Sequence, residues 1–158
     1  MKNTLCLYYT RTGTTKALME QIAQKLDAEL VEYTDGKSRA GAYGYLTACL
    51  DSFKKPLPRV KKPKTERPLS EYEKVVIAMP IWAENCCAVG RGLLEKYRDE
   101  LPEQVYFVIT HMADSPYDKA IAKLDNYLNS PNQGWLSVST RKDDLAEEIE
   151  SFVELVNV

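Results

Sequence analysis

Short apolar runs alternate along the chain with stretches in which apolar residues recur every three or four positions. The runs predict strands at residues 5–9, 30–33, 75–79, 105–109 and 135–138. The periodic stretches predict helices at residues 18–26, 42–53, 89–97, 117–128 and 145–156. In the second of these, the apolar face consists of Tyr45, Leu46, Cys49, Leu50 and Phe53. Strands that alternate with helices predict an α/β fold whose parallel sheet is covered by helices on both faces.

Length and composition are typical of a single globular domain that covers residues 1–158. Hydrophobic residues make up 44% of the chain and charged residues 28%, and no stretch approaches the length of a membrane span. The chain enters its first strand directly, without a signal peptide, so we expect a cytoplasmic protein. A net charge of −2 argues against nucleic acid or an anionic membrane as a partner.

Charge is unevenly distributed along the chain. The segment 54–68 carries seven Lys or Arg, one Glu and four prolines, which predicts a solvated crossover on the surface. A docking patch for an acidic partner is the alternative interpretation of this segment. The last predicted helix has the opposite bias, and its outer face carries Asp143, Asp144, Glu147, Glu148, Glu150 and Glu154.

The loop between the first strand and the first helix combines hydroxyls with one glycine. A strand that turns directly into a helix leaves the first helical amides unpaired, and the helix dipole adds positive charge there. Gly13 permits a tight turn, and Thr10, Thr12, Thr14 and Thr15 add O–H donors. A threonine N-cap and an ordinary turn would give a similar pattern, but one cap needs only one hydroxyl. The loop therefore predicts a phosphate site, without the spacing of a Walker loop.

Two further loops are expected at the same edge of the sheet, because ligands of open parallel sheets bind beyond the carboxyl ends of the strands. They are Pro80–Asn85, after the third strand, and Thr110–Asp114, after the fourth. Trp82 either covers a flat aromatic ligand or closes the edge of the core. A phosphate loop beside an aromatic wall favours a phosphorylated flat heterocycle.

The four cysteines, at positions 6, 49, 86 and 87, have neither the spacing of a zinc site nor that of a disulfide framework, so we expect no metal. Cys86 and Cys87 lie near a predicted helix start, a position that lowers a thiol pKa. Two small buried thiols are the simpler interpretation.

The chain resembles the flavodoxin family over most of its length. Residues 7–15 (LYYTRTGTT) are close to the signature of the loop that binds the phosphate of FMN, with Cys6 at a position that is usually aliphatic. Residues 35–41 and 44–46 are similar to the second strand-to-helix connection of a bacterial subgroup. Residues 79–82 (MPIW) resemble the subgroup's segment after the third strand. The resemblance implies a three-layer α/β/α sandwich with five parallel strands in the order 2-1-3-4-5.

The resemblance also implies roles for particular residues. It assigns the FMN phosphate to Thr10, Thr12, Gly13, Thr14 and Thr15, with Arg11 beside it, and the isoalloxazine to Pro80, Ile81, Trp82 and Ala83. In the third loop only Thr110 fits the subgroup, because His111, Met112 and Ala113 replace small residues there. This departure implies either weaker FMN binding or an altered redox potential of the bound flavin. Alternatively, His111 has a catalytic role as a proton donor near the flavin.

The function predicted is that of an FMN-binding protein in electron transfer, or an FMN-dependent oxidoreductase that uses NAD(P)H to reduce a small acceptor such as a quinone. The partner is then either a redox protein or NAD(P)H with its acceptor, and the near-neutral charge favours the second.

A flavodoxin fold that has lost FMN and serves as a binding module is the alternative. A low-molecular-weight tyrosine phosphatase is excluded because Cys6 lies in the strand rather than in the loop before Arg11, and a receiver domain lacks its carboxylates. The oligomeric state is not predicted.

Overall fold

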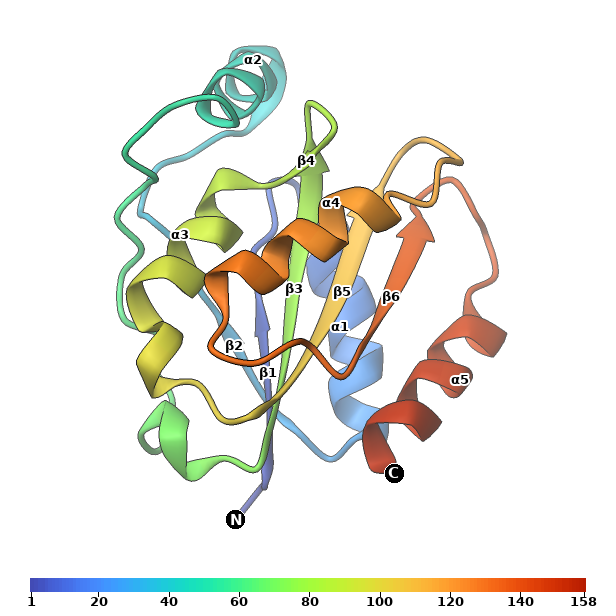
Figure 1. Ribbon diagram of the computed structural model, residues 1–158. Coiled ribbons are helices and arrows are strands. Elements are labelled where there is room, and N and C mark those ends of the chain that lie inside the picture. The colour runs from blue at the N-terminus through green and yellow to red at the C-terminus, as the bar shows by residue number, and fades with distance from the viewer.

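Five parallel strands form the central sheet in the computed structural model, which describes residues 1–158 (Figure 1). They are β1 (Thr4–Tyr8), β2 (Glu29–Glu32), β3 (Lys74–Trp82), β5 (Gln104–His111) and β6 (Gly134–Ser139). Their order is β2-β1-β3-β5-β6. Because β5 and β6 are the fourth and fifth parallel strands, the predicted order 2-1-3-4-5 is confirmed.

Helices cover both faces of the sheet, as predicted. They are α1 (Thr14–Lys25), α2 (Gly41–Asp51), α3 (Ala88–Tyr97), α4 (Asp118–Ala122) and α5 (Ala146–Asn157), with short 3-10 helices η1 (Leu69–Glu71), η2 (Arg98–Glu100) and η3 (Lys123–Tyr127). The helix predicted at 117–128 is thus divided into α4 and η3. In η3, Leu124 stays in the core while the carboxylate of Asp125 accepts hydrogen bonds from Asn132, which turns the chain toward β6.

The core consists of two apolar clusters separated by the sheet. Alternate residues of each strand point to opposite faces, so Leu5 and Leu7 of β1 join one cluster while Cys6 and Tyr8 join the other. The first cluster packs under α3 and η3, and the second packs under α1 and α5. The central strands are therefore buried on both sides, which explains why their sequences are apolar throughout.

Strand β3 is longer than the sequence pattern predicts. Residues 80–82, expected in a loop, extend the strand: Pro80 pairs with Thr110 of β5, while Ile81 and Trp82 pair with a short antiparallel strand, β4 (Asn85–Cys86). The hairpin turn has Ala83 and Glu84 in the left-handed region, with φ of 47° and 67°. Thr110 and His111 are likewise strand residues, because they pair with Val138 and Ser139 of β6. The sequence pattern ended both strands too early because Pro80, Thr110 and His111 are residue types common in loops, although they still pair in the sheet.

Helix α2 stands above the carboxyl end of the sheet, beyond α3, rather than on a sheet face (Figure 1). Its inner side is narrow, and Gly44, Ala48 and Asp51 are the buried residues. A Cβ at Gly44 would lie 2.0 Å from the carbonyl carbon of Arg39, so only glycine allows this close approach. The apolar side chains of the opposite side, predicted to share one face, remain exposed except for the half-buried Cys49.

The two charged segments lie where the sequence places them. All seven basic residues of 54–68 are exposed or half-buried, while Val60 in their midst is buried and anchors the crossover to the body. Four of the six C-terminal carboxylates, those of Glu147, Glu148, Glu150 and Glu154, belong to α5, while Asp143 and Asp144 lie just before it; all six are exposed or half-buried. None of the helices combines the length and the apolar character that crossing a lipid bilayer requires.

Candidate functional site

A cavity of about 330 Å³ opens at the carboxyl ends of β1, β3, β5 and β6. Its lining residues are Thr10, Arg11, Thr12, Thr14, Thr15, Tyr45, Pro80, Ile81, Trp82, Thr110, His111, Met112 and Thr140. The structure thus brings together ten of the twelve predicted site residues. A second groove, of about 420 Å³, lies between β6 and α5 and is shallower, and no set of loop amides converges on it.

The loop after β1 presents unpaired backbone amides to this cavity. Gly13 is left-handed, with φ of 97°, and α1 starts directly after it without a side-chain cap. The amides of Arg11, Thr12, Thr14, Thr15 and Lys16 donate to no acceptor in the protein. Open space surrounds the position where a Cβ at Gly13 would lie, so glycine is required here for its backbone conformation. Such a cluster of amides at a helix start is an anion-binding nest.

The loop hydroxyls divide into two pairs. Those of Thr10 and Thr15 are used within the protein, because Thr10 Oγ1 accepts a hydrogen bond from the Gly13 amide at 2.9 Å and Thr15 Oγ1 bonds to Thr110 Oγ1 at 2.8 Å. Those of Thr12 and Thr14 have no protein partner and remain available to a ligand. Two of the threonine hydroxyls therefore shape the loop, while the other two are free to bond to a ligand.

Trp82 forms part of the cavity wall but is only 4% exposed. Its ring packs edge-on against Tyr9, with 5.5 Å between ring centroids, and lies 5.2 Å from the guanidinium of Arg39. The indole N–H is buried and has no acceptor in the protein. Buried donors are nearly always paired, so this unpaired N–H is an exception beside the cavity wall.

Arg39, whose side chain is fully buried, forms an ion cluster next to Trp82 of the cavity wall. Its guanidinium donates two bonds to Asp35, at 2.8 and 3.0 Å, and two to Asp51 Oδ2, at 2.9 and 3.0 Å. It also donates to the Tyr9 hydroxyl at 3.3 Å. Burial by itself would raise the pKa of Asp35, but the hydrogen bonds and charge of Arg39 outweigh it and hold that pKa below its usual value.

This cluster connects several parts of the cavity wall. Asp51 is the last residue of α2, which carries Tyr45, and Ser52 Oγ donates to the Trp82 carbonyl at 3.0 Å. The Arg39 carbonyl accepts from Arg11 at 3.3 Å, and the guanidinium of Arg11 lies over the Tyr45 ring at 5.5 Å. Arg39 therefore fixes the positions of wall residues from three different elements.

His111 is 7% exposed, and both of its ring nitrogens are engaged. Nδ1 lies 2.6 Å from the Ala113 carbonyl oxygen and Nε2 lies 2.9 Å from Ser137 Oγ. The ring also packs on Tyr117, with 4.8 Å between centroids. In this arrangement the imidazole braces the loop that follows β5, and a catalytic role for His111 stays a prediction.

No family model matches the chain, and no curated protein matches it in sequence. Solved structures do resemble it. A flavoprotein of Lactobacillus acidophilus NCFM in complex with FMN superposes with a TM-score of 0.71 at 24% identity, covering 87% of this chain and 93% of its own. A protein of Bacteroides eggerthii gives a TM-score of 0.77 at 19% identity over 99% of this chain and 98% of its own. A flavodoxin from the domain Archaea gives 0.50 at 13% identity, over 97% and 92%. The chain has the flavodoxin-like fold.

In this flavodoxin-like fold, the sequence analysis missed two cavity residues, Tyr45 and Thr140, and placed Met112 in a site loop without giving it a role. Thr140 follows β6, so the rule that ligands bind at carboxyl ends of strands was sufficient to find it. Tyr45 was assigned to the apolar face of a helix, and no sequence signal showed that this face turns outward. Gly13 and Ala83 are not part of the lining, because one shapes the loop backbone and the other forms the hairpin turn.

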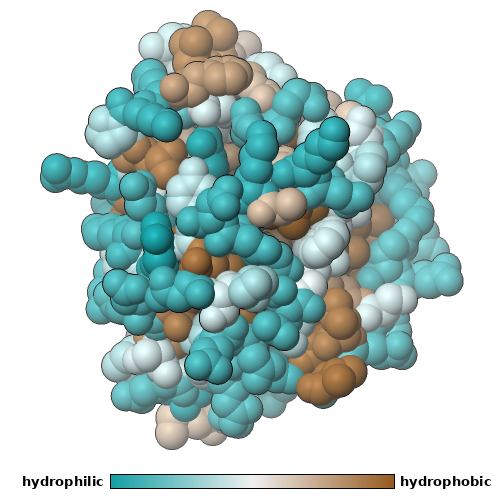
Figure 2. Space-filling model, in the orientation of Figure 1, coloured by the Kyte–Doolittle hydropathy of each residue, from teal (hydrophilic) through white to brown (hydrophobic).

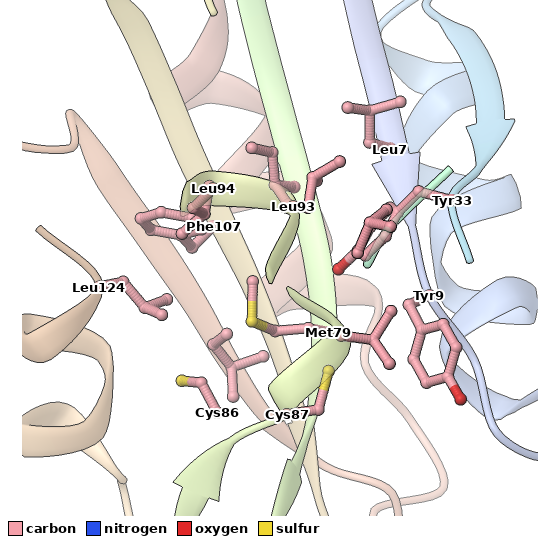
Figure 3. Packing of buried hydrophobic residues seen from close by; sticks show 14 of the residues in the cluster. Leu7, Tyr9, Tyr33, Met79, Cys86, Cys87, Leu93, Leu94, Phe107 and Leu124 are labelled. Carbon is pink, nitrogen blue, oxygen red and sulfur yellow. The ribbon is translucent and has the colours of Figure 1, made fainter. Parts of the chain in front are cut away.

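The cysteines of this flavodoxin-like domain are free thiols, and all but Cys49 are buried. Figure 3 shows the sulfur atoms of Cys86 and Cys87 among apolar side chains such as Met79 and Leu124. Burial raises the pKa of Cys6, Cys86 and Cys87 to about 12, so the idea that a helix start lowers the pKa of the adjacent pair is wrong. Desolvation outweighs the helix start here, where Cys87 Sγ accepts a hydrogen bond from the Gly90 amide.

Thiol labelling should reflect this burial. At about pH 8 we expect Cys49 to react with an aromatic disulfide reagent within minutes and the other three thiols to react at least ~100-fold more slowly. The reason is that three thiols are both inaccessible and protonated at that pH. Mass spectrometry of the labelled protein identifies the site, and denaturant serves as the control that releases all four thiols. Fast labelling of Cys86 or Cys87 in the folded protein would contradict this expectation.

Proposed function

We propose that this chain binds FMN at the carboxyl end of its sheet and uses it to reduce a small acceptor with electrons from NAD(P)H. The observation that carries the proposal is the nest of five unpaired amides around left-handed Gly13. It offers the N–H donors and the positive helix end that a phosphate monoester dianion requires. The free hydroxyls of Thr12 and Thr14 add to this anion site, and Arg11 adds a positive charge nearby.

The other half of the cavity suits a flat ring with polar edges. Pro80, Ile81 and Trp82 supply an apolar wall, and the neighbouring Thr110 supplies a polar group at its edge. Thr110 links the ring side to the phosphate side through its bond to Thr15. These residues fit FMN, and the relative from L. acidophilus that was solved with FMN supports the same ligand.

The chemistry that FMN supplies when bound is the transfer of a hydride from a nicotinamide to an acceptor such as a quinone. The residues around the cavity favour an anionic donor such as NAD(P)H, because no carboxylate lines the cavity and Arg11 contributes a positive charge to it. A carrier that docks through acidic groups around its flavin would need carboxylates at this rim. The exposed Met112 and Tyr45 instead offer an apolar mouth to a small acceptor.

Reconstitution with FMN tests the proposal. We expect the protein, after incubation with FMN and gel filtration, to retain the visible absorption bands of flavin and to oxidise NADPH or NADH when a quinone is present. Protein without FMN is the control for both readings. If no flavin is retained even after incubation at high concentration, the proposal is wrong and the fold serves as a binding module without FMN. If flavin is retained but neither nicotinamide reduces it, a protein electron donor replaces NAD(P)H.

A further inference from the structure

The outward face of α2 carries an apolar stripe with no partner in the chain. Its members are Tyr43, Leu46, Leu50 and Phe53, with exposed fractions of 83, 55, 55 and 72%. Phe53 lies in the turn after the helix, where its amide bonds to the Leu50 carbonyl at 3.1 Å and continues the helical path. Figure 2 shows the corresponding hydrophobic surface at the top of the molecule, over α2. Single exposed apolar residues are common on surfaces, but a continuous stripe of four is not.

The spacing of the stripe is the same when it is read in either direction. The steps between its members are three, four and three residues, which is the spacing of a helix-pairing seam. The order of residue types, aromatic, leucine, leucine, aromatic, is symmetric about Ala48. When two such helices pack antiparallel, Tyr43 of one faces Phe53 of the other, and Leu46 faces Leu50. A surface that complements itself in this way is what an isologous twofold interface requires.

Charge and area agree with this arrangement. The outward face of α2 carries no ionised residue, since its one acid, Asp51, is buried against Arg39, so two copies meet without repulsion at the centre. With the adjoining Tyr45, the stripe exposes on the order of 600 Å² of apolar side chain, close to what each partner buries in a standard interface. The opposite side of α2, with Gly44 and Ala48, is occupied by the chain's own body.

We propose that the stripe Tyr43–Leu46–Leu50–Phe53 is the interface of a homodimer in which the α2 helices of two copies pack antiparallel. The two cavities then open beside this interface, because Tyr45 lines the cavity and adjoins the stripe. The inference is independent of whether FMN binds, since it rests on the exposed helix face alone.

Sedimentation equilibrium of the full chain tests the interface. We expect a dimer at concentrations of roughly 10 to 200 µM and a rise of at least ~100-fold in the dimer dissociation constant for Leu46→Glu. Trp135→Ser, which changes an exposed aromatic on β6 far from α2, is the matched control and should leave the dimer intact. Circular dichroism verifies that each variant is folded. A wild-type protein that stays monomeric over this range, or a dimer that survives Leu46→Glu, overturns the proposal.

A pair of charge variants tests the antiparallel register. Because Leu46 faces Leu50 of the other copy, Leu46→Lys mixed with Leu50→Glu should form a heterodimer more tightly than either variant pairs with itself. Leu46→Lys mixed with Leu46→Glu should gain no such preference, because position 46 does not face itself. If the second mixture pairs as tightly as the first, the register is wrong.

Discussion

Replacing Arg39 with methionine is expected to lower the free energy of unfolding by about 3–5 kcal/mol, the range for removing one partner of a buried ion pair. Methionine fills much the same space but leaves the buried carboxylate of Asp35 without its cation, and leaves Asp51 with only the exposed Lys54, 3.2 Å from its Oδ1. The surface pair of Lys62 and Glu100 provides a matched control. There, Lys62→Met should cost no more than about 1 kcal/mol, because solvent screens exposed charges. Urea denaturation measures both variants.

The loss of unfolding free energy in Arg39→Met should be larger at neutral pH than at acidic pH. The pKa of Asp35 is lower in the folded protein than in the unfolded chain. The ionised Asp35 therefore stabilises the fold at a pH above its unfolded pKa, and this stabilisation is lost as the pH falls through its folded pKa. In Arg39→Met the uncompensated carboxylates take up protons as the pH falls. The difference between the two proteins should therefore be largest near neutral pH and shrink below about pH 4. A triple variant with Asp35→Asn and Asp51→Asn added should recover part of the stability at neutral pH, and a constant deficit at every pH would contradict this explanation.

Changing Gly13 to alanine is expected to weaken FMN binding about 100-fold while riboflavin binding changes little. The left-handed backbone of Gly13 costs alanine about 1–2 kcal/mol, and any relaxation of this angle turns the neighbouring amides away from the phosphate. Riboflavin lacks the phosphate and so does not depend on the nest. Titration calorimetry with the two flavins separates a change in the nest from a change in the ring site.

Gly41 provides the matched control for this substitution. It is also left-handed, with φ of 75°, and a Cβ there meets nothing within 4 Å, as at Gly13. Gly41→Ala should therefore lose similar stability without a selective loss of FMN. Equal losses of FMN and riboflavin in Gly13→Ala would show that the nest does not hold the phosphate.

The order of strands and helices follows from the sequence because the strands are buried on both sides and so are apolar throughout, as in residues 75–79. The exact strand ends do not follow, because pairing continues through residues such as Pro80 and Thr110 whose types are typical of loops. The position of α2 could not be predicted from the sequence either. Its pattern shows that one face is apolar, but not whether that face meets the chain's own sheet or solvent.

The candidate site was largely predictable because one rule, that ligands bind at the carboxyl ends of parallel strands, identified its loops. The buried Arg39 cluster was not predicted. Its signals were Asp35 and Arg39 four residues apart and a single acid, Asp51, on an apolar helix, and each is common on surfaces. Only the folded chain shows that these three charges share one buried position.

The hairpin of β3 and β4 projects beyond the main sheet, so changes in its turn do not affect the pairing of the parallel strands. Pro80 is the last residue of β3 paired with β5, and beyond it Ile81 and Trp82 pair only with β4. The turn at Ala83 and Glu84 lies outside both apolar clusters. The length and sequence of this two-residue turn can therefore diverge while the rest of the domain is retained, so evolution or engineering can alter the surface beside the cavity here at little risk to folding.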